Sequence, residues 1–161
     1  STGGFGAEAT ESAGSDAKRR LGPLASVVTG VKEFVELRPV AGRFRADGEV
    51  IHDGDFLLFA VGNARQTGGG SLLTPRAEFG DGKLDLLVVP DMPRMDFLSL
   101  LPDLRAGTHL KTPGLLYVQA ADIEVESDRD LDVHADGEPV TGRRFRYELA
   151  ERGLIMMVPA E

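Results

Sequence analysis

The pattern of apolar and polar positions divides the chain into a helical N-terminal part and a longer part rich in strands. Apolar side chains recur at helical spacing in LASVVTGVKEFVE (24–36), which predicts a helix with one face on a core. From Val40 onward, short apolar or alternating runs are separated by Gly, Asp and Pro, as expected for antiparallel strands. These runs are GRFRA (42–46), DFLLFAVG (55–62), KLDLLVV (83–89), LLYVQA (115–120), DIEVES (122–127), LDVHA (131–135), RFRYELA (144–150) and LIMMVP (154–159).

The run count and spacing predict a mainly β fold in a single domain. Residues 1–39 are expected to form a lead-in segment and helix, and residues 40–161 the β part. One more helix is predicted from Met95 to Arg105. The Asp-Gly pairs at 47, 53, 81 and 136 are predicted hairpin turns, because Gly accepts positive φ at little cost.

Composition excludes several classes of protein. The 161 residues are 42% hydrophobic and 27% charged, as in ordinary globular domains. A net charge of −8 argues against a general nucleic-acid binder, which needs a basic surface. With no cysteine and three scattered histidines, a metal would be a hard cation on oxygen ligands. No apolar run is long enough to span a bilayer and STGGFGAEAT lacks signal-peptide features, so a cytoplasmic location is expected.

Three stretches are candidates for function. VGNARQTGGGSLLTP (61–75) places three consecutive glycines after an apolar strand, which fits either a flexible loop or the wall of a cleft. PRAEFGDGKLDLLVV (75–89) puts the Asp81 carboxylate at a tight turn, which fits a Mg²⁺ or Ca²⁺ site as well as a plain hairpin. The triplet Asp-Gly-Glu occurs twice, at 47–49 and 136–138, and in both places a turn is the simplest interpretation.

Taken together, several stretches resemble the C-terminal half of the bacterial diacylglycerol kinase-like lipid kinases, which are related to sphingosine kinases. The resemblance covers nearly the whole chain and rests on GGFGAEAT (3–10), VGNARQTGGGSLLTP (61–75), FGDGKLDLLVV (79–89), DVHADGEPV (132–140) and FRYELAERGLIMMVP (145–159). It implies a two-sheet antiparallel β-sandwich, as in NAD kinases, with one or two packed helices. It also implies a preceding nucleotide-binding domain with a Gly-Gly-Asp-Gly-Thr motif, which this sequence lacks. The chain is therefore interpreted as a fragment of a longer kinase, inactive alone.

The resemblance further implies a reaction and its principal residues. The family transfers the γ-phosphoryl group of ATP to a lipid hydroxyl, here a diacylglycerol-like acceptor, in a cleft between its two domains. Its catalytic base falls on Glu138, whose carboxylate can take the hydroxyl proton. A second, non-catalytic Mg²⁺ is implied at the Asp81 carboxylate and the backbone carbonyls of Glu78 and Lys83.

Other residues match less specific parts of the family pattern. The loop that faces the cleft in the family corresponds to Asn63, Arg65, Gly68, Gly69 and Gly70. Arg65 could face phosphate or hold the loop through an ion pair, and Asp136 could shape its turn or share the hydrogen bonding of Glu138. Glu49 does not match the motif and is expected to be structural. His134 stands where relatives often have Asn, and is interpreted as filling the strand.

The expected partners follow from the resemblance. They are a lipid substrate at the membrane surface, approached by a cytoplasmic protein, and a nucleotide-binding domain that binds most of the ATP. No nucleic acid is expected, and a homodimer through an exposed strand edge is left open. Two alternatives also stay open: a non-catalytic lipid-binding or regulatory module, and a kinase for a non-lipid acceptor such as NAD. No motif identifies the acceptor lipid.

Overall fold

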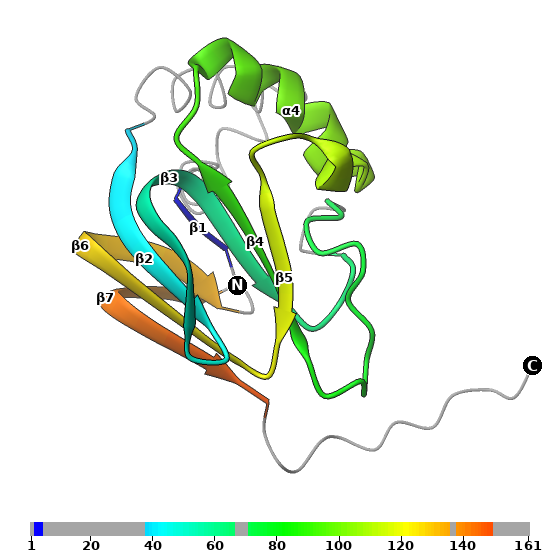
Figure 1. Cartoon of the computed structure of the whole chain (residues 1–161), viewed down its shortest axis with the longest axis vertical. Coiled ribbons are helices and arrows are strands. Elements are labelled where there is room, and N and C mark those ends of the chain that lie inside the picture. Colours follow the sequence, from blue (N-terminus) through cyan, green and yellow to red (C-terminus); the bar gives the residue numbers. More distant parts are fainter. Residues whose placement is uncertain (1, 5–37, 67–70, 136–137, 150–161) are drawn as a thin grey trace, which may run out of the picture.

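The computed structural model describes residues 2–4, 38–66, 71–135 and 138–149. Within these ranges the chain forms seven strands, one α-helix and one 3-10 turn (Figure 1). The elements are β1 (Thr2–Gly4), β2 (Val40–Ala46), β3 (Glu49–Gly62), β4 (Leu84–Pro90), α4 (Arg94–Ala106), η1 (His109–Lys111), β5 (Leu116–Ala120), β6 (Asp122–Ala135) and β7 (Glu138–Glu148). The predicted mainly β fold is confirmed. The helix predicted over 24–36 and the strand predicted over 154–159 lie outside the described residues.

The strands form one antiparallel sheet in the order β1-β6-β2-β3-β4-β5, and β7 pairs with β6. Strands β1 and β2 each pair with both β3 and β6. They therefore both lie between these two strands, at different points along them. The described strands join a single sheet, and the second sheet of the predicted sandwich is not seen among them. Strand twist explains the difference: β3 and β6 have 14 residues each, long enough to bend one sheet around its own core.

That core lies on the inner face of the bent sheet. It combines buried side chains from β2, β3, β4, β6 and the end of β5, with partly buried residues of β5 and β7 packed against it. Three phenylalanine rings, Phe44, Phe56 and Phe59, stand edge to face at its centre, with centroids 4.9–5.9 Å apart. Within the described residues, the one bent sheet therefore resembles a sandwich in cross-section.

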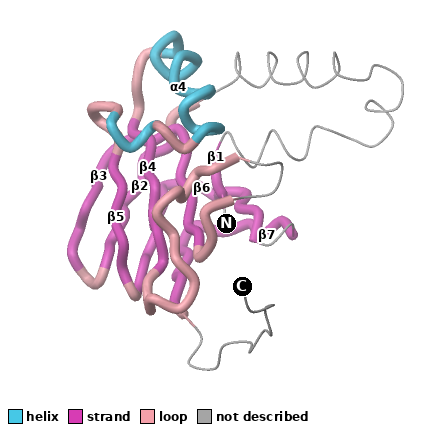
Figure 2. The backbone as a smooth tube through the Cα atoms, turned by 90° about the vertical axis from the view of Figure 1, so that its right-hand side faces the viewer, coloured by secondary structure: helices cyan, strands magenta, loops and turns pink. Residues whose placement is uncertain are grey.

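Helix α4 covers part of the outer face. Its buried side chains, Phe97, Leu100 and Leu104, pack against β3 and β4 in a second core. Burying each of them contributes about 2 kcal/mol. Figure 2 shows the helix beside the upper ends of the strands. The helix ends at Gly107, whose φ of 74° gives a left-handed cap, so the helix predicted over 95–105 is confirmed. No helix in the described ranges is long and apolar enough to span a membrane.

Two of the predicted Asp-Gly turns have different outcomes. Asp47 and Gly48 form the turn between β2 and β3, with φ values of 50° and 84°, which confirms that prediction. The turn predicted at Asp53 is wrong, because Asp53 and Gly54 lie inside β3. There Asp53 is paired across the ladder with Arg43, and their side chains form a 2.7 Å ion pair, so the local turn signal yields to cross-strand pairing.

The runs DIEVES and LDVHA form one strand, β6, instead of two. Between Glu126 and Leu131 the register with β7 shifts, so residues 127–130 form a bulge. Ser127 Oγ donates to the carbonyl of Arg143, and Arg143 Nε donates to Asp130 Oδ1 at 2.7 Å. These bonds to a residue distant in the sequence keep residues 127–130 within one strand, where the sequence alone predicts a break between two strands.

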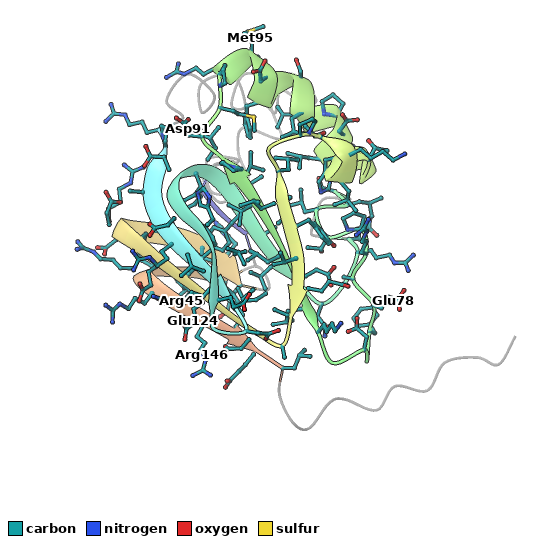
Figure 3. All side chains as sticks on the ribbon, viewed as in Figure 1. Arg45, Glu78, Asp91, Met95, Glu124 and Arg146 are labelled. Carbon is teal, nitrogen blue, oxygen red and sulfur yellow. The ribbon has the colours of Figure 1, made fainter. Side chains whose placement is uncertain are left out.

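The outer face of β2, β6 and β7 carries rows of ion pairs. Arg45 lies 3.7 Å from carboxylate oxygens of both Glu124 and Glu126 on β6. Arg146 of β7 reaches Asp122 at 2.9 Å, and Figure 3 shows this group on one flank of the molecule, away from Glu78. Among the described strands β7 pairs with β6 alone, and charged side chains of this kind disfavour strand pairing with another chain.

Candidate functional site

Glu138 is the first residue of β7 and pairs with Ala135 across the ladder. Its side chain is exposed, so the carboxylate is accessible from solvent. The neighbouring His134 pairs with Thr2 of β1, and Thr2 pairs with Ala60 near the end of β3. Three strand spacings of about 4.8 Å therefore place the start of β7 roughly 14 Å from that point.

The loop that follows β3 is packed against residues 74–78. Thr74 is fully buried, and its Oγ1 donates to the carbonyl of Ala64 at 2.7 Å. Arg65 Nε donates to the carbonyl of Ala77 at 3.3 Å, and its guanidinium lies 3.6 Å from the Glu78 carboxylate. Arg65 therefore holds the loop, which was one of its two predicted roles. The exposed Asn63 lies on the same loop.

Asp81 lies on an exposed loop, residues 78–83, that leads into β4. Its Oδ1 accepts the backbone N–H of Lys83 at 2.9 Å, which closes the turn through the aspartate side chain. Gly80 and Gly82 both have positive φ, 86° and 74°, a backbone path that other residues adopt only with strain. The chain turns at Asp81, but the predicted hairpin is wrong, because this turn lies within the long connection between β3, which ends at Gly62, and β4, which begins at Leu84.

Some predicted site residues cannot be placed. Gly68, Gly69, Gly70 and Asp136 lie outside the described residues. For the rest, the structure brings Arg65, Glu78 and Asp81 into one loop region. Glu138 lies at the start of β7, which β6, β1 and β3 separate from the strand that follows this region.

The structure also contains a buried polar network that the sequence reasoning missed. Asp85 is fully buried, and its carboxylate accepts the Tyr117 hydroxyl at 2.5 Å and the Gln119 amide at 3.1 Å. The Tyr117 oxygen accepts the N–H of Arg76 at 3.2 Å, and the Gln119 amide donates to the Arg76 carbonyl at 3.5 Å. Burial, together with the hydrogen bond to Asp85, raises the pKa of Tyr117 well above its usual range, so the phenol remains a donor.

The only local signal for this network was one aspartate within the apolar run KLDLLVV. Its partners stand more than 30 residues later in the chain, on β5. They meet Asp85 because β4 and β5 pair antiparallel, with Gln119 directly opposite. That register was not predictable from the spacing of hydrophobic residues.

With this geometry described, comparison with known proteins identifies the family. Residues 2–156 match the family described as the YegS C-terminal NAD kinase beta sandwich-like domain. The chain belongs to this family. The resemblance to lipid kinases inferred from the sequence is thereby confirmed.

Relatives of this YegS C-terminal domain come from several bacteria. A protein of Pseudomonas aeruginosa (strain PAO1) named "Probable lipid kinase YegS-like" is 36% identical over 99% of this chain and 52% of its own length. One of the same name from Stenotrophomonas maltophilia is 34% identical, again over 99% and 52%. The chain thus spans about half the length of the curated relatives it matches.

A solved structure supports the fold. The crystal structure of a diacylglycerol kinase from Bacillus anthracis str. Sterne matches with a TM-score of 0.54 and 21% identity. The match covers 71% of this chain and 41% of that protein. At this identity the likeness supports the fold alone.

The Mg²⁺ implied by the family can be tested against the residues present. Among the described residues, no three His, Cys, Asp or Glu side chains gather as ligands for a metal. The implied set is different in kind, since it consists of the Asp81 carboxylate with two backbone carbonyls on an exposed turn. Oxygens of this type suit Mg²⁺, which keeps several waters and needs few protein ligands. The donor set of the 78–83 loop therefore fits the ion.

The hydrogen bonding around Asp47 and His134 bears on whether these two residues have structural roles. Asp47 Oδ1 accepts the backbone N–H groups of Ala121 and Asp122 at 2.9 and 3.0 Å, so the first Asp-Gly-Glu triplet fastens a turn, as predicted. Both ring nitrogens of His134 are shielded, and neither has a hydrogen-bond partner among the described residues. That the ring only fills the strand stays a prediction.

Proposed function

We propose that this chain is the C-terminal, substrate-side domain of an ATP-dependent lipid kinase that phosphorylates a diacylglycerol-like hydroxyl. The observation that carries the proposal is the family match over residues 2–156, together with relatives that are named as lipid kinases and are about twice as long. The isolated domain is expected to be inactive, because ATP would be bound mainly by the other half of such a protein.

In the proposed reaction the lipid oxygen attacks the γ-phosphorus of ATP and ADP leaves. Glu138 accepts the proton of the attacking hydroxyl, so that the products are the phosphorylated lipid, ADP and a protonated carboxyl group. The exposed side chain at the start of β7 supports this role, since a base must reach a substrate from outside the domain. Positioning of the hydroxyl in line with phosphorus supplies most of the remaining catalysis.

The loops near the end of β3 are proposed to complete the cleft. Asn63 and the glycines at 68–70 would approach the substrate, with Asp136 beside the base. Arg65 would act indirectly, since its bonds to Ala77 and Glu78 hold the loops together. The Asp81 carboxylate with the Glu78 and Lys83 carbonyls would bind the second, non-catalytic Mg²⁺, which takes no part in the phosphoryl transfer itself.

The test is lipid phosphorylation by the full-length protein that contains this domain. Glu138→Gln is compared with wild type across diacylglycerol, ceramide, phosphatidylglycerol and sphingoid bases, with NAD as a non-lipid acceptor. Glu49→Gln is the matched control, because Glu49 also follows an Asp-Gly pair, is exposed and opposes an alanine, Ala46.

We expect Glu138→Gln to lower kcat by about 10²–10⁴-fold, the range for loss of a general base, and Glu49→Gln to leave it unchanged. Full activity in both variants would refute the assignment of the base. Phosphorylation of NAD without any lipid would instead favour the non-lipid kinase. Lipid binding without phosphorylation of any acceptor would favour the regulatory module.

A further inference from the structure

The two ends of the 78–83 loop are tied together beneath it. Arg76 lies two residues before the loop and Asp85 two residues after it. Tyr117 and Gln119 of β5 bridge the two, because each bonds both the Asp85 carboxylate and the Arg76 backbone. The hydroxyl of Tyr117 donates to Asp85, so its oxygen is available to accept the Arg76 N–H.

Packing alone does not explain a carboxylate at this position. Asp85 is fully buried in β4, two residues before Leu87, which belongs to the apolar core under α4. Burying a carboxylate is costly unless hydrogen bonds replace its water, and an apolar side chain would meet the needs of that core. What Asp85 adds is orientation, since it fixes the Tyr117 hydroxyl and the Gln119 amide toward Arg76.

Residues 74–77, which precede the loop, are also held on the side that faces the end of β3. The N–H of Ala77 donates to the carbonyl of Thr74 at 3.0 Å, and the carbonyl of Ala77 accepts Arg65 Nε. A Cβ added at Gly62 would lie 2.4 Å from Thr74 Oγ1, so the end of β3 and this segment are in close contact. Residues 74–77 therefore form a rigid support for Glu78.

We propose that Asp85, Tyr117 and Gln119 are positioning residues for a cation site in the 78–83 loop. This rests on the proposed function, which assigns Mg²⁺ to Asp81 and to the carbonyls of Glu78 and Lys83. Mg²⁺ demands near-octahedral geometry, so its affinity depends on the separation of those two carbonyls. The hydrogen bonds of Tyr117 and Gln119 to Arg76 and Asp85 form a clamp at the base of the loop. This clamp sets the distance between the Glu78 and Lys83 carbonyls.

The experiment is a calorimetric Mg²⁺ titration of the full-length protein without nucleotide. Asp81→Asn identifies the site, as the binding component that this variant removes. Tyr117→Phe and Gln119→Leu each break one bridge of the clamp. Tyr147→Phe is the matched control, because Tyr147, the other tyrosine of the chain, lies on β7 against the inner core.

We expect Tyr117→Phe to weaken Mg²⁺ binding about tenfold, in the range found for outer partners of metal ligands. Gln119→Leu should act in the same direction, and gives a second reading if Tyr117→Phe does not fold. The Tyr147→Phe control should bind like wild type. A purely structural network would lower the melting temperature of the clamp variants and leave the Mg²⁺ dissociation constant unchanged.

Two negative outcomes are distinguishable. If wild type binds Mg²⁺, Asp81→Asn abolishes that binding and both clamp variants bind like wild type, the positioning role is overturned while the metal site stands. If wild type has no component that Asp81→Asn removes, the metal assignment of the proposed function fails, and the positioning role fails with it.

Discussion

Replacing Asp47 tests how the bent sheet is fastened at its corner. The Asp47 carboxylate accepts two backbone N–H groups, from Ala121 and Asp122, and its own N–H donates to the Asp122 carbonyl at 2.8 Å. These bonds join the β2–β3 turn to the single residue that connects β5 with β6. The chain passes there from one arm of the sheet to the other, so the turn braces the crossing.

The expected loss has two parts. Asp47→Ala removes both side-chain hydrogen bonds, and in this exposed position they contribute about 1–2 kcal/mol together. Alanine must also adopt the positive φ of 50°, which costs about 1 kcal/mol more than aspartate. The free energy of unfolding should therefore fall by about 2–3 kcal/mol, and the melting temperature by roughly 5–10 °C for a domain of this size.

Two further variants at position 47 separate these parts. Asp47→Asn keeps an acceptor oxygen and tolerates positive φ, so it should cost at most about 1 kcal/mol. Asp47→Gly keeps the turn geometry without the acceptor and should cost about 1–2 kcal/mol. Urea unfolding followed by circular dichroism measures all three, since the chain has no tryptophan. A loss below about 0.5 kcal/mol for Asp47→Ala would refute the proposed brace.

Three other predictions concern stability. Arg45→Met should cost about 0.5 kcal/mol at low salt and less at 1 M NaCl, because its ion pairs lie near the surface; equal losses at both salt concentrations would contradict this. Burial lowers the pKa of His109, so its contribution to stability is present above about pH 6.5 and is lost as the pH falls further. We expect the free energy of unfolding, from urea titrations between pH 7.5 and 5, to fall less with decreasing pH in His109→Asn than in wild type. An equal fall in both proteins would exclude the linkage to His109. Gly62→Ala should cost about 1–3 kcal/mol through its clash with Thr74, while Gly54→Ala on the same strand, where the nearest atom is 3.7 Å away, should be tolerated.

Local sequence signals predicted the elements whose causes are local. Helix α4 was predicted within one residue at each end, because its apolar side chains recur at helical spacing and Gly107 ends it with a left-handed cap. The Asp47 turn was predicted because only a few residue types accept positive φ. Neither prediction needed information about distant parts of the chain.

Features fixed by distant pairing were predicted less well. Asp53 and Gly54 have the composition of a turn, yet Arg43 across the ladder keeps them within β3. Residues 127–130 look like a break, yet bonds to Arg143 make them a bulge in one strand. The single bent sheet has the same origin, since β1 joins β3 to β6 from the far end of the sequence.

The two Asp-Gly-Glu triplets show where local reasoning ends. Glu49 and Glu138 each begin a strand three residues after an alanine with which they pair, and both are exposed. Exposure and strand pairing therefore do not distinguish a base from a turn residue. What differs is the wider setting: the first turn is bound by the amides at 121–122, whereas β7 begins beside the end of β6, which pairs with β1. Because the two glutamates share their exposure and their pairing with an alanine, a difference between Glu49→Gln and Glu138→Gln would report on features other than these two.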